Sequence, residues 1–408
     1  MKKVWDKWTR IALVKRILVG LILGAILGIA VPQATGIAIL GDVFVSALKA
    51  IAPLLVFFLV ISSLCNAGKS HGGVIKTVII LYMFSTVLAA VIAVFASMAF
   101  PVKMTLANAA TDTSAPQGIV EVLNNLLLNV VANPVSSLVN ANYVGILMWA
   151  VLLGLAFRAA DKMTKKVLAD VADGISMVVT WIINLAPFGI FGLVFNTVST
   201  NGLDIFTTYG KLLLLLVGCM LFIYFVTNPL LVYWCIRQNP YPLIFHCLKR
   251  SALTAFFTRS SAANIPVNMK VCEEMGLDRD TYSVTIPLGA TINMDGAAIT
   301  ITVMTMATAF TLGIHVDIPT AIILSLLAAL SACGASGVAG GSLLLIPMAC
   351  SLFGISDDIS MQVVAVGFII GVIQDSVETA LNSSSDLLLS ASAEFRQWRL
   401  EGKEIKLK

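Results

Sequence analysis

The feature that most limits what this chain can fold into is a series of apolar runs, each long enough to cross a lipid bilayer. Three of them cover residues 11–31, 74–100 and 212–234. A helix of about 20 consecutive apolar residues spans the hydrocarbon core of a membrane. Only 12% of the residues are charged, whereas soluble domains contain about 25%. The sequence therefore predicts an all-α membrane protein with several crossings.

The distribution of lysine and arginine indicates how the chain is threaded through the membrane. Basic clusters alternate with loops that contain almost none of these residues, at 101–118, 199–206 and 313–319. Cytoplasmic loops are enriched in lysine and arginine. This alternation predicts eight full crossings with both termini in the cytoplasm. It also accounts for the net charge of +4 without a nucleic-acid partner.

Two segments in the second half of the chain contain apolar arms too short to cross the membrane. Residues 243–270 and 319–352 each place two such arms around a tip of small and hydroxyl residues. Segments of this kind predict re-entrant helical hairpins, which are tolerated where protein or water covers the tip. A helix of unusual polar content follows each one, at about 280–312 and 358–395. A hairpin and helix followed by an inverted copy are typical of the inverted repeats of secondary transporters.

The last of these helices carries a stripe of polar residues. Intervals of four, three and four residues place its members on one helical face, and they are Asp375, Thr379, Asn382 and Asp386. Ionisable residues inside a membrane are costly and mark functional sites by default. The alternative is a stripe that faces neighbouring helices or a water-filled vestibule, with its acids protonated or neutralised by Arg259.

The segment PLGATINMDG, residues 287–296, places Asn293 and Asp295 in a helix that its proline and glycines weaken. A weakened helix leaves backbone carbonyl groups free to coordinate a ligand. Carboxylate, carboxamide and carbonyl oxygens together favour a hard cation such as sodium over a soft metal. The alternative is a glycine-rich kink in which Asp295 pairs with Arg259.

The tips of the two predicted hairpins add further candidate residues. Arg259, Ser260 and Ser261 present hydroxyl groups and free backbone amides near a helix start, an arrangement that attracts a carboxylate. The alternative for this tip is an ordinary serine-rich turn. The second tip contains GASGVAGG at 334–341, and its position between two short arms predicts a gate.

In this order, the motifs TRSSAANIP, PLGATINMDG, GASGVAGG and D…T..N…D resemble those of the dicarboxylate/amino acid:cation symporter family, which includes the glutamate transporters. Within it, the chain is most similar to the bacterial sodium:serine/threonine symporters. The resemblance implies a glutamate-transporter-like elevator fold with eight transmembrane helices and two re-entrant helical hairpins. It also implies a homotrimer in the bacterial cytoplasmic (inner) membrane. A static scaffold would contain 1–73 and 119–205, a moving transport domain 74–100 and 206–395, and a cytoplasmic tail 396–408.

The same resemblance implies two sets of binding residues. The substrate would contact Arg259, Ser260, Ser261, Val338, Gly340, Asp375, Glu378, Thr379 and Asn382. Asp375 would bind its ammonium group and Asn382 its carboxylate. Sodium ions, transported with the substrate, would contact Tyr82, Ser85, Thr86, Gly289, Thr291, Asn293, Asp295, Asn382 and Asp386. No other cofactor is expected.

Departures from the family pattern favour a small neutral amino acid as substrate, serine or threonine first. Members with acidic substrates carry an arginine at the position of Glu378 and usually a threonine at that of Ala297. A buried carboxylate at Glu378 would repel a second carboxylate, whereas Thr379 can hydrogen-bond a small hydroxyl group. Acidic amino acids or dicarboxylates on the same fold are the closest alternative.

Two alternatives come from other functional classes. An intramembrane aspartyl protease would use Asp295 and Asp375 as a pair sharing one proton, but the chain lacks the expected GxGD motif. A passive channel would conduct without accumulating its substrate, which two hairpins closing over one site disfavour. The sequence therefore predicts a symporter and not an enzyme.

Overall fold

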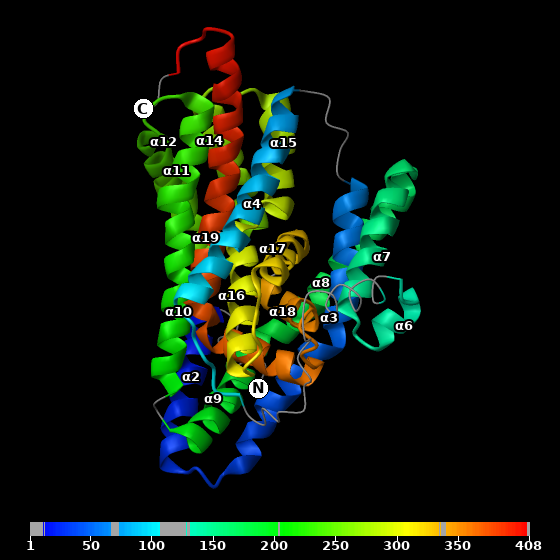
Figure 1. Ribbon diagram of the computed structural model, residues 1–408, viewed down its shortest axis with the longest axis vertical. Helices are drawn as coiled ribbons and strands as arrows, with labels where there is room; N and C mark the ends of the chain where they lie inside the picture. The colour runs from blue at the N-terminus through cyan, green and yellow to red at the C-terminus, as the bar shows by residue number, and fades with distance from the viewer. Residues whose placement is uncertain are drawn as a thin grey trace.

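The computed structural model describes residues 11, 13–66, 73–106, 128, 131–202, 205–333, 335 and 340–405, and the regular elements in these ranges are all helices (Figure 1). The first half contains α2 (Leu13–Ala30), α3 (Ile39–Asn66), α4 (Gly73–Ala99), α6 (Pro134–Val139), α7 (Tyr143–Ala156), α8 (Lys162–Asn184) and α9 (Ala186–Asn201). The second half contains α10 (Ile205–Phe222), α11 (Asn228–Ile236), α12 (Tyr241–Cys247), α13 (Leu253–Thr258), α14 (Ser261–Glu274), α15 (Arg279–Ile292), α16 (Asp295–Thr311), α17 (Ile318–Ala332), α18 (Ile346–Ser351) and α19 (Asp357–Leu400).

Six helical runs in the described ranges are long and apolar enough to cross a membrane. They are Thr35–Ser62, Gly73–Ala99, Lys162–Asn184, Phe206–Ile236, Arg279–Thr311 and Asp357–Leu400. These runs agree with the prediction of an all-α membrane protein with several crossings. The exact number of eight crossings stays a prediction.

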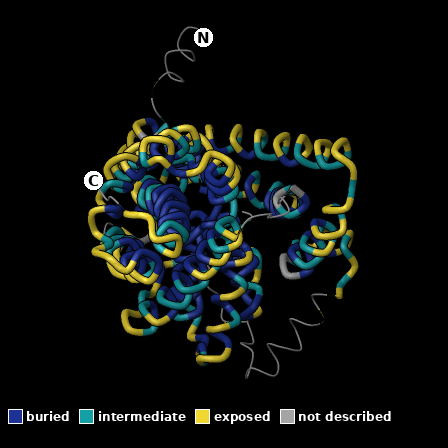
Figure 2. The backbone as a smooth tube through the Cα atoms, turned by 90° about the horizontal axis from the view of Figure 1, so that it is seen from above, coloured by how far each residue is buried: buried dark blue, intermediate teal, exposed yellow. Residues whose placement is uncertain are grey.

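The helices form two groups that pack chiefly within themselves. One contains α2, α3, α7, α8 and α9, and the other contains α4 together with α10 to α19. In the view from above, the buried backbone gathers towards the centre of the helix cluster and exposed residues lie outside it (Figure 2). α16 and the middle of α19 are almost wholly buried. α16 has no charged residue after Asp295, and a helix without a charged face is readily buried by its neighbours.

Two prolines have opposite effects on the helices of the first group. Pro53 lies inside α3 without interrupting it. Pro187 lies at a boundary between two helices, because α8 ends at Asn184 and α9 begins at Ala186, directly before the proline. Proline has no amide hydrogen for the preceding turn and is tolerated best in the first turn of a new helix.

The two predicted hairpins correspond to successive short helical arms. In the first, α12 and α13 lead to Arg259, whose left-handed backbone (φ 52°) ends the arm before α14 begins. In the second, α17 is followed by the tip and then by the 3₁₀ turn Gly341–Leu345 and α18. With 14 and 15 residues, α14 and α17 are roughly 21 and 22 Å long. Both are shorter than the hydrocarbon core of about 30 Å.

The helix is interrupted within PLGATINMDG, as its composition predicts. α15 ends at Ile292 and α16 begins at Asp295, so Asn293 and Met294 have non-helical backbone angles. Pro287 itself lies inside α15. The break places the Asp295 carboxylate in the first turn of α16, where the helix dipole favours a negative charge.

α19 has 44 residues and a length of about 66 Å. It continues to Leu400, past the start of the predicted tail 396–408. Arg396 lies over the ring of Trp234 in α11, with 5.3 Å between the guanidinium carbon and the ring centroid. This contact packs the end of α19 against α11. The expected tail and the scaffold segment that starts at 119 lie partly outside the described residues.

Candidate functional site

Asp295 lies in a buried cluster of oxygen atoms between α4 and α16. Its side chain is 0% exposed. The Ser85 hydroxyl donates to Oδ2 at 2.8 Å, and the Thr86 hydroxyl donates to Oδ1 at 3.2 Å. The amide of Met294 donates to the Thr86 hydroxyl at 3.2 Å, which ties the helix break to α4. Three residues of the predicted sodium set, Ser85, Thr86 and Asp295, are therefore in direct contact.

Asn293 connects this cluster to α19. Its amide nitrogen donates to Asp386 Oδ1 at 2.9 Å and lies 3.5 Å from the Asn382 carbonyl oxygen. Its own Oδ1 is buried and has no hydrogen-bond partner among the described residues. A buried acceptor left unpaired costs about 1–3 kcal/mol. This oxygen therefore points to a ligand that the protein itself does not supply.

Tyr82 and Gly289 enclose Asp386 from α4 and α15. The Tyr82 hydroxyl lies 2.8 Å from the backbone oxygen of Asp386 and 3.3 Å from that of Thr285. A Cβ atom on Gly289 would lie 2.9 Å from both Asp386 Oδ1 and the Tyr82 hydroxyl. Real Cβ contacts are essentially never this short, so a side chain at position 289 would displace the Asp386 carboxylate or the Tyr82 hydroxyl.

The carboxyl groups of Asp295 and Asp386 have no positively charged partner in the described part of the chain. Both residues are at most 1% exposed, and neither takes part in an ion pair there. A buried ionised carboxylate is strongly unfavourable unless it is paired or coordinates a metal ion. The cluster offers carboxylate, carboxamide and hydroxyl oxygens, and oxygen ligands suit a hard cation.

A second group of contacts surrounds Asp375, near the hairpin tips. Arg259 Nε lies 2.6 Å from Oδ2 and forms an ion pair in which both side chains are almost buried. The Gly340 amide donates to Oδ1 at 3.1 Å. Ser260 caps α14, because its hydroxyl accepts from the Ala263 amide at 3.2 Å. Both tips thus meet at one carboxylate of α19.

Glu378 is held by three donors. Its Oε2 accepts from the hydroxyls of Thr300 at 2.7 Å and Ser342 at 2.9 Å, and from the amide of Gln374 at 2.5 Å. Gln374 also donates to the Thr300 hydroxyl at 2.7 Å. Sequence reasoning misses Thr300 and Ser342. The one signal in the sequence that could have indicated these two residues is the spacing of hydroxyl side chains along apolar segments.

Asn382 joins the two groups of residues. It lies on α19 between Glu378 and Asp386. Its Oδ1 accepts from the Gly296 amide at 2.7 Å, and its Nδ2 lies 3.5 Å from the sulfur of Met294. The side chain therefore holds the start of α16 against α19, between the oxygen cluster and the hairpin tips.

The remaining predicted residues have varied positions. Ser261 is the buried first residue of α14, and Thr379 is buried on α19. The Thr291 hydroxyl donates to the Leu288 carbonyl at 2.7 Å, within its own helix. Val338 lies outside the described residues.

The ion pair of Arg259 shows which acid this residue neutralises, for which the sequence left two alternatives. Arg259 binds Asp375, whereas Asp295 is bound by hydroxyl groups of α4. The hypothesis that Arg259 neutralises Asp295 is therefore wrong. The hypothesis that it neutralises an acid of the α19 stripe is correct for Asp375.

Comparison with known proteins identifies the family. Residues 13–394 match the profile of the Sodium:dicarboxylate symporter family. The chain belongs to this family. The serine/threonine transporter SstT of Bifidobacterium adolescentis is 57% identical over 406 residues, which cover 99% of this chain and 94% of the relative. Transporters of the same name from two strains of Streptococcus thermophilus are 55% and 56% identical over 400 residues, covering 98% of this chain and 100% of each relative.

Membership of the Sodium:dicarboxylate symporter family bears on several predictions. The resemblance read from the motifs is confirmed over almost the whole chain. The relatives are transporters, so the prediction that the chain is not an enzyme is confirmed and the protease hypothesis is wrong. Together with the apolar helices, the family makes this chain a multi-pass membrane transporter.

Proposed function

We propose that the protein is a sodium-coupled symporter that imports small neutral amino acids, serine and threonine first, across the bacterial cytoplasmic (inner) membrane. The proposal is carried by the buried acids Asp295 and Asp386, which lack a cationic partner among the described residues, beside the unpaired oxygen of Asn293. A cation that arrives from solution would neutralise these groups when they are ionised. The names of the relatives at 55–57% identity support the substrate class.

Sodium would bind where α4, the break between α15 and α16, and α19 meet. The ligands would be side-chain oxygens of Tyr82, Ser85, Thr86, Asn293, Asp295 and Asp386 and backbone oxygens of Gly289, Thr291 and Asn382. The hydrogen bonds from Ser85 and Thr86 to Asp295 support this assignment, because they already bring the hydroxyl and carboxylate oxygens together. A sodium ion there would be coordinated by these hydroxyl and carboxylate oxygens, and its charge would offset the negative charge of the acids.

The amino acid would bind at the meeting point of the hairpin tips. Asp375 would bind its ammonium group and Asn382 its carboxylate, aided by the tip residues Ser260, Ser261, Val338 and Gly340. In the structure, Arg259 and the Gly340 amide each occupy one oxygen of Asp375. An incoming ammonium group would compete with both tips for this carboxylate, so substrate binding and tip position would be coupled.

Glu378 favours a neutral substrate over glutamate, aspartate or a dicarboxylate. Its donors hold the carboxylate in place within the buried stripe that also contains Thr379. Two carboxylates about 6 Å apart repel by about 3 kcal/mol at an effective dielectric constant of 20, or roughly 100-fold in affinity. Thr379 is suited to hydrogen-bond the hydroxyl of serine or threonine.

Transport would follow an elevator mechanism. Eight transmembrane helices and two re-entrant hairpins would form the scaffold, 1–73 and 119–205, and the transport domain, 74–100 and 206–395, in a homotrimer with cytoplasmic termini. The separate packing of α2, α3 and α7 to α9 from α4 and α10 to α19 supports this division. A membrane potential of 100 mV, negative inside, supplies about 2.3 kcal/mol for each sodium ion that enters. That energy would drive uptake against a substrate gradient.

Uptake of labelled serine into proteoliposomes tests the proposal. An inward sodium gradient should drive accumulation, and a choline gradient should not. Asp375→Asn should abolish uptake, whereas Asp280→Asn, an exposed position in the first turn of α15, should leave it unchanged. Sodium-independent accumulation, or normal uptake by Asp375→Asn, would refute the proposal. Competition by glutamate as strong as by unlabelled serine would favour an acidic substrate.

A further inference from the structure

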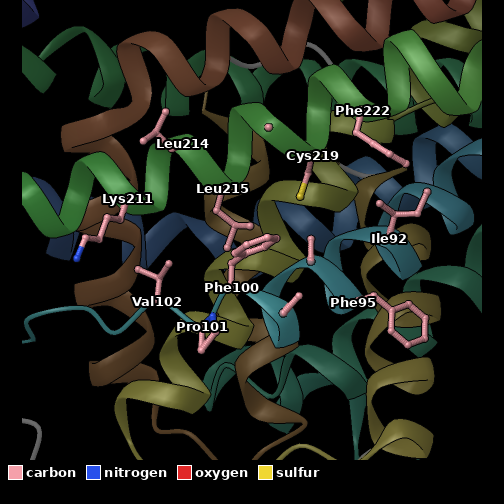
Figure 3. A pocket seen from close by; sticks show the side chains of 13 residues that line it. Ile92, Phe95, Phe100, Pro101, Val102, Lys211, Leu214, Leu215, Cys219 and Phe222 are labelled. Atoms are coloured by element: carbon pink, nitrogen blue, oxygen red, sulfur yellow. The ribbon is translucent and has the colours of Figure 1, made fainter.

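An apolar groove of about 920 Å³ runs between α4 and α10 (Figure 3). The end of α4 and the residues directly after it line one side, and α10 lines the other. The lining includes Phe95, Phe100, Leu214 and Phe222. None of the predicted substrate or sodium residues lines it. The groove is therefore separate from the candidate transport site.

The groove is open at the surface of the protein. Both α4 and the run Phe206–Ile236, which contains α10, are long and apolar enough to cross the membrane. Several of their lining side chains are exposed on the protein surface, among them Leu214 at 75% and Phe95 at 54%. An acyl chain gains no hydrophobic energy by entering such a groove, because lipid tails are as apolar as leucine. Selective binding of one lipid therefore requires a polar contact.

Lys211 supplies a polar contact at one end of the groove. It is exposed, it is the only charged residue of the lining, and it has no ion-pair partner within the described ranges. Lys211 lies near Pro101 and Val102, whereas Ile92 and Phe222 lie at the opposite end (Figure 3). From Lys211 to Phe222, α10 rises roughly 16 Å. This length matches one leaflet of a hydrocarbon core about 30 Å thick.

We propose that the groove binds one anionic phospholipid, whose acyl chain lies between α4 and α10 and whose phosphate group pairs with Lys211. Charge complementarity selects the headgroup, because the apolar walls do not distinguish one lipid from another. A lysine near the membrane surface favours an anionic over a zwitterionic lipid by about fivefold. The inference does not depend on which solute is transported.

Native mass spectrometry of the purified, delipidated full-length protein tests this site. The probes are phosphatidylglycerol and phosphatidylcholine with identical palmitoyl and oleoyl chains. The wild-type protein should bind phosphatidylglycerol about fivefold more tightly, and Lys211→Gln should bind both lipids equally. Gly218→Leu should weaken the binding of both, because Gly218 lines the groove and a Cβ there would meet open space.

Gly210→Leu is the matched control for the groove-filling variant. Gly210 lies on the same helix and also faces open space, but it is not part of the lining. Both substitutions raise helix propensity equally, so only filling of the groove separates them. Equal binding of the two lipids by the wild type, or equal effects of Gly210→Leu and Gly218→Leu, would overturn the proposal. A smaller oligomer for Gly218→Leu would assign the groove to a contact between copies and would overturn it as well.

Discussion

Replacing Thr300 by valine isolates one contact of the network that holds Glu378. The fully buried Thr300 hydroxyl donates to Glu378 at 2.7 Å and accepts from Gln374 at 2.7 Å. Valine has nearly the same shape, so the substitution removes both hydrogen bonds without opening a large cavity. Thr302→Val is the matched control on α16. The Thr302 hydroxyl is equally buried and has no hydrogen-bond partner among the described residues.

The two substitutions should differ by about 2–3 kcal/mol in the free energy of unfolding. Thr300→Val should cost about 2 kcal/mol, because it removes two buried hydrogen bonds that contribute about 1 kcal/mol each, while two donors to Glu378 remain. Exchanging the unpaired hydroxyl of Thr302 for a methyl group should be neutral or stabilising by up to about 1 kcal/mol. For a chain of 408 residues, an unfolding entropy of about 0.9 kcal/mol/K converts 2 kcal/mol into a shift of about 2 °C.

Thermal unfolding of the purified proteins in one detergent, at one scan rate, measures this difference. The midpoint should fall by about 2 °C for Thr300→Val and should stay constant or rise for Thr302→Val. An equal fall for both variants would refute the reasoning. The cost would then come from changing any buried threonine of α16 and not from the hydrogen bond to Glu378.

Three further predictions concern the cation cluster and substrate choice. Gly289→Ala should raise the sodium concentration for half-maximal serine uptake about tenfold, because its Cβ would lie 2.9 Å from Asp386 Oδ1. Gly174→Ala, where a Cβ meets no atom within 4 Å, should not change it, and an unchanged requirement in both variants would contradict the site. Replacing sodium by choline should abolish the rise in unfolding midpoint that serine produces, and an equal rise in both salts would argue against coupling. Glu378→Gln should strengthen competition by glutamate for serine uptake about 10- to 100-fold, and unaltered selectivity would exclude Glu378 as the discriminating charge.

Properties of single segments were determined by the sequence alone. The length of the apolar runs requires a membrane-spanning helical protein. The helical repeat places Asp375, Asn382 and Asp386 on one face, whatever packs against it. The weakness of the helix around Asp295 is also local, because proline and glycines lower helix stability in any surroundings. The shared motifs were sufficient for the family as well.

Contacts between segments were decided only by the tertiary structure. Arg259 pairs with Asp375, 116 positions away. Glu378 takes hydroxyl donors from Thr300 and Ser342, 78 and 36 positions away. The groove between α4 and α10 likewise exists only where two distant helices lie side by side. Periodicity specifies which face of a helix is polar, but the neighbour that this face meets depends on how separate helices rotate and slide when their side chains interlock.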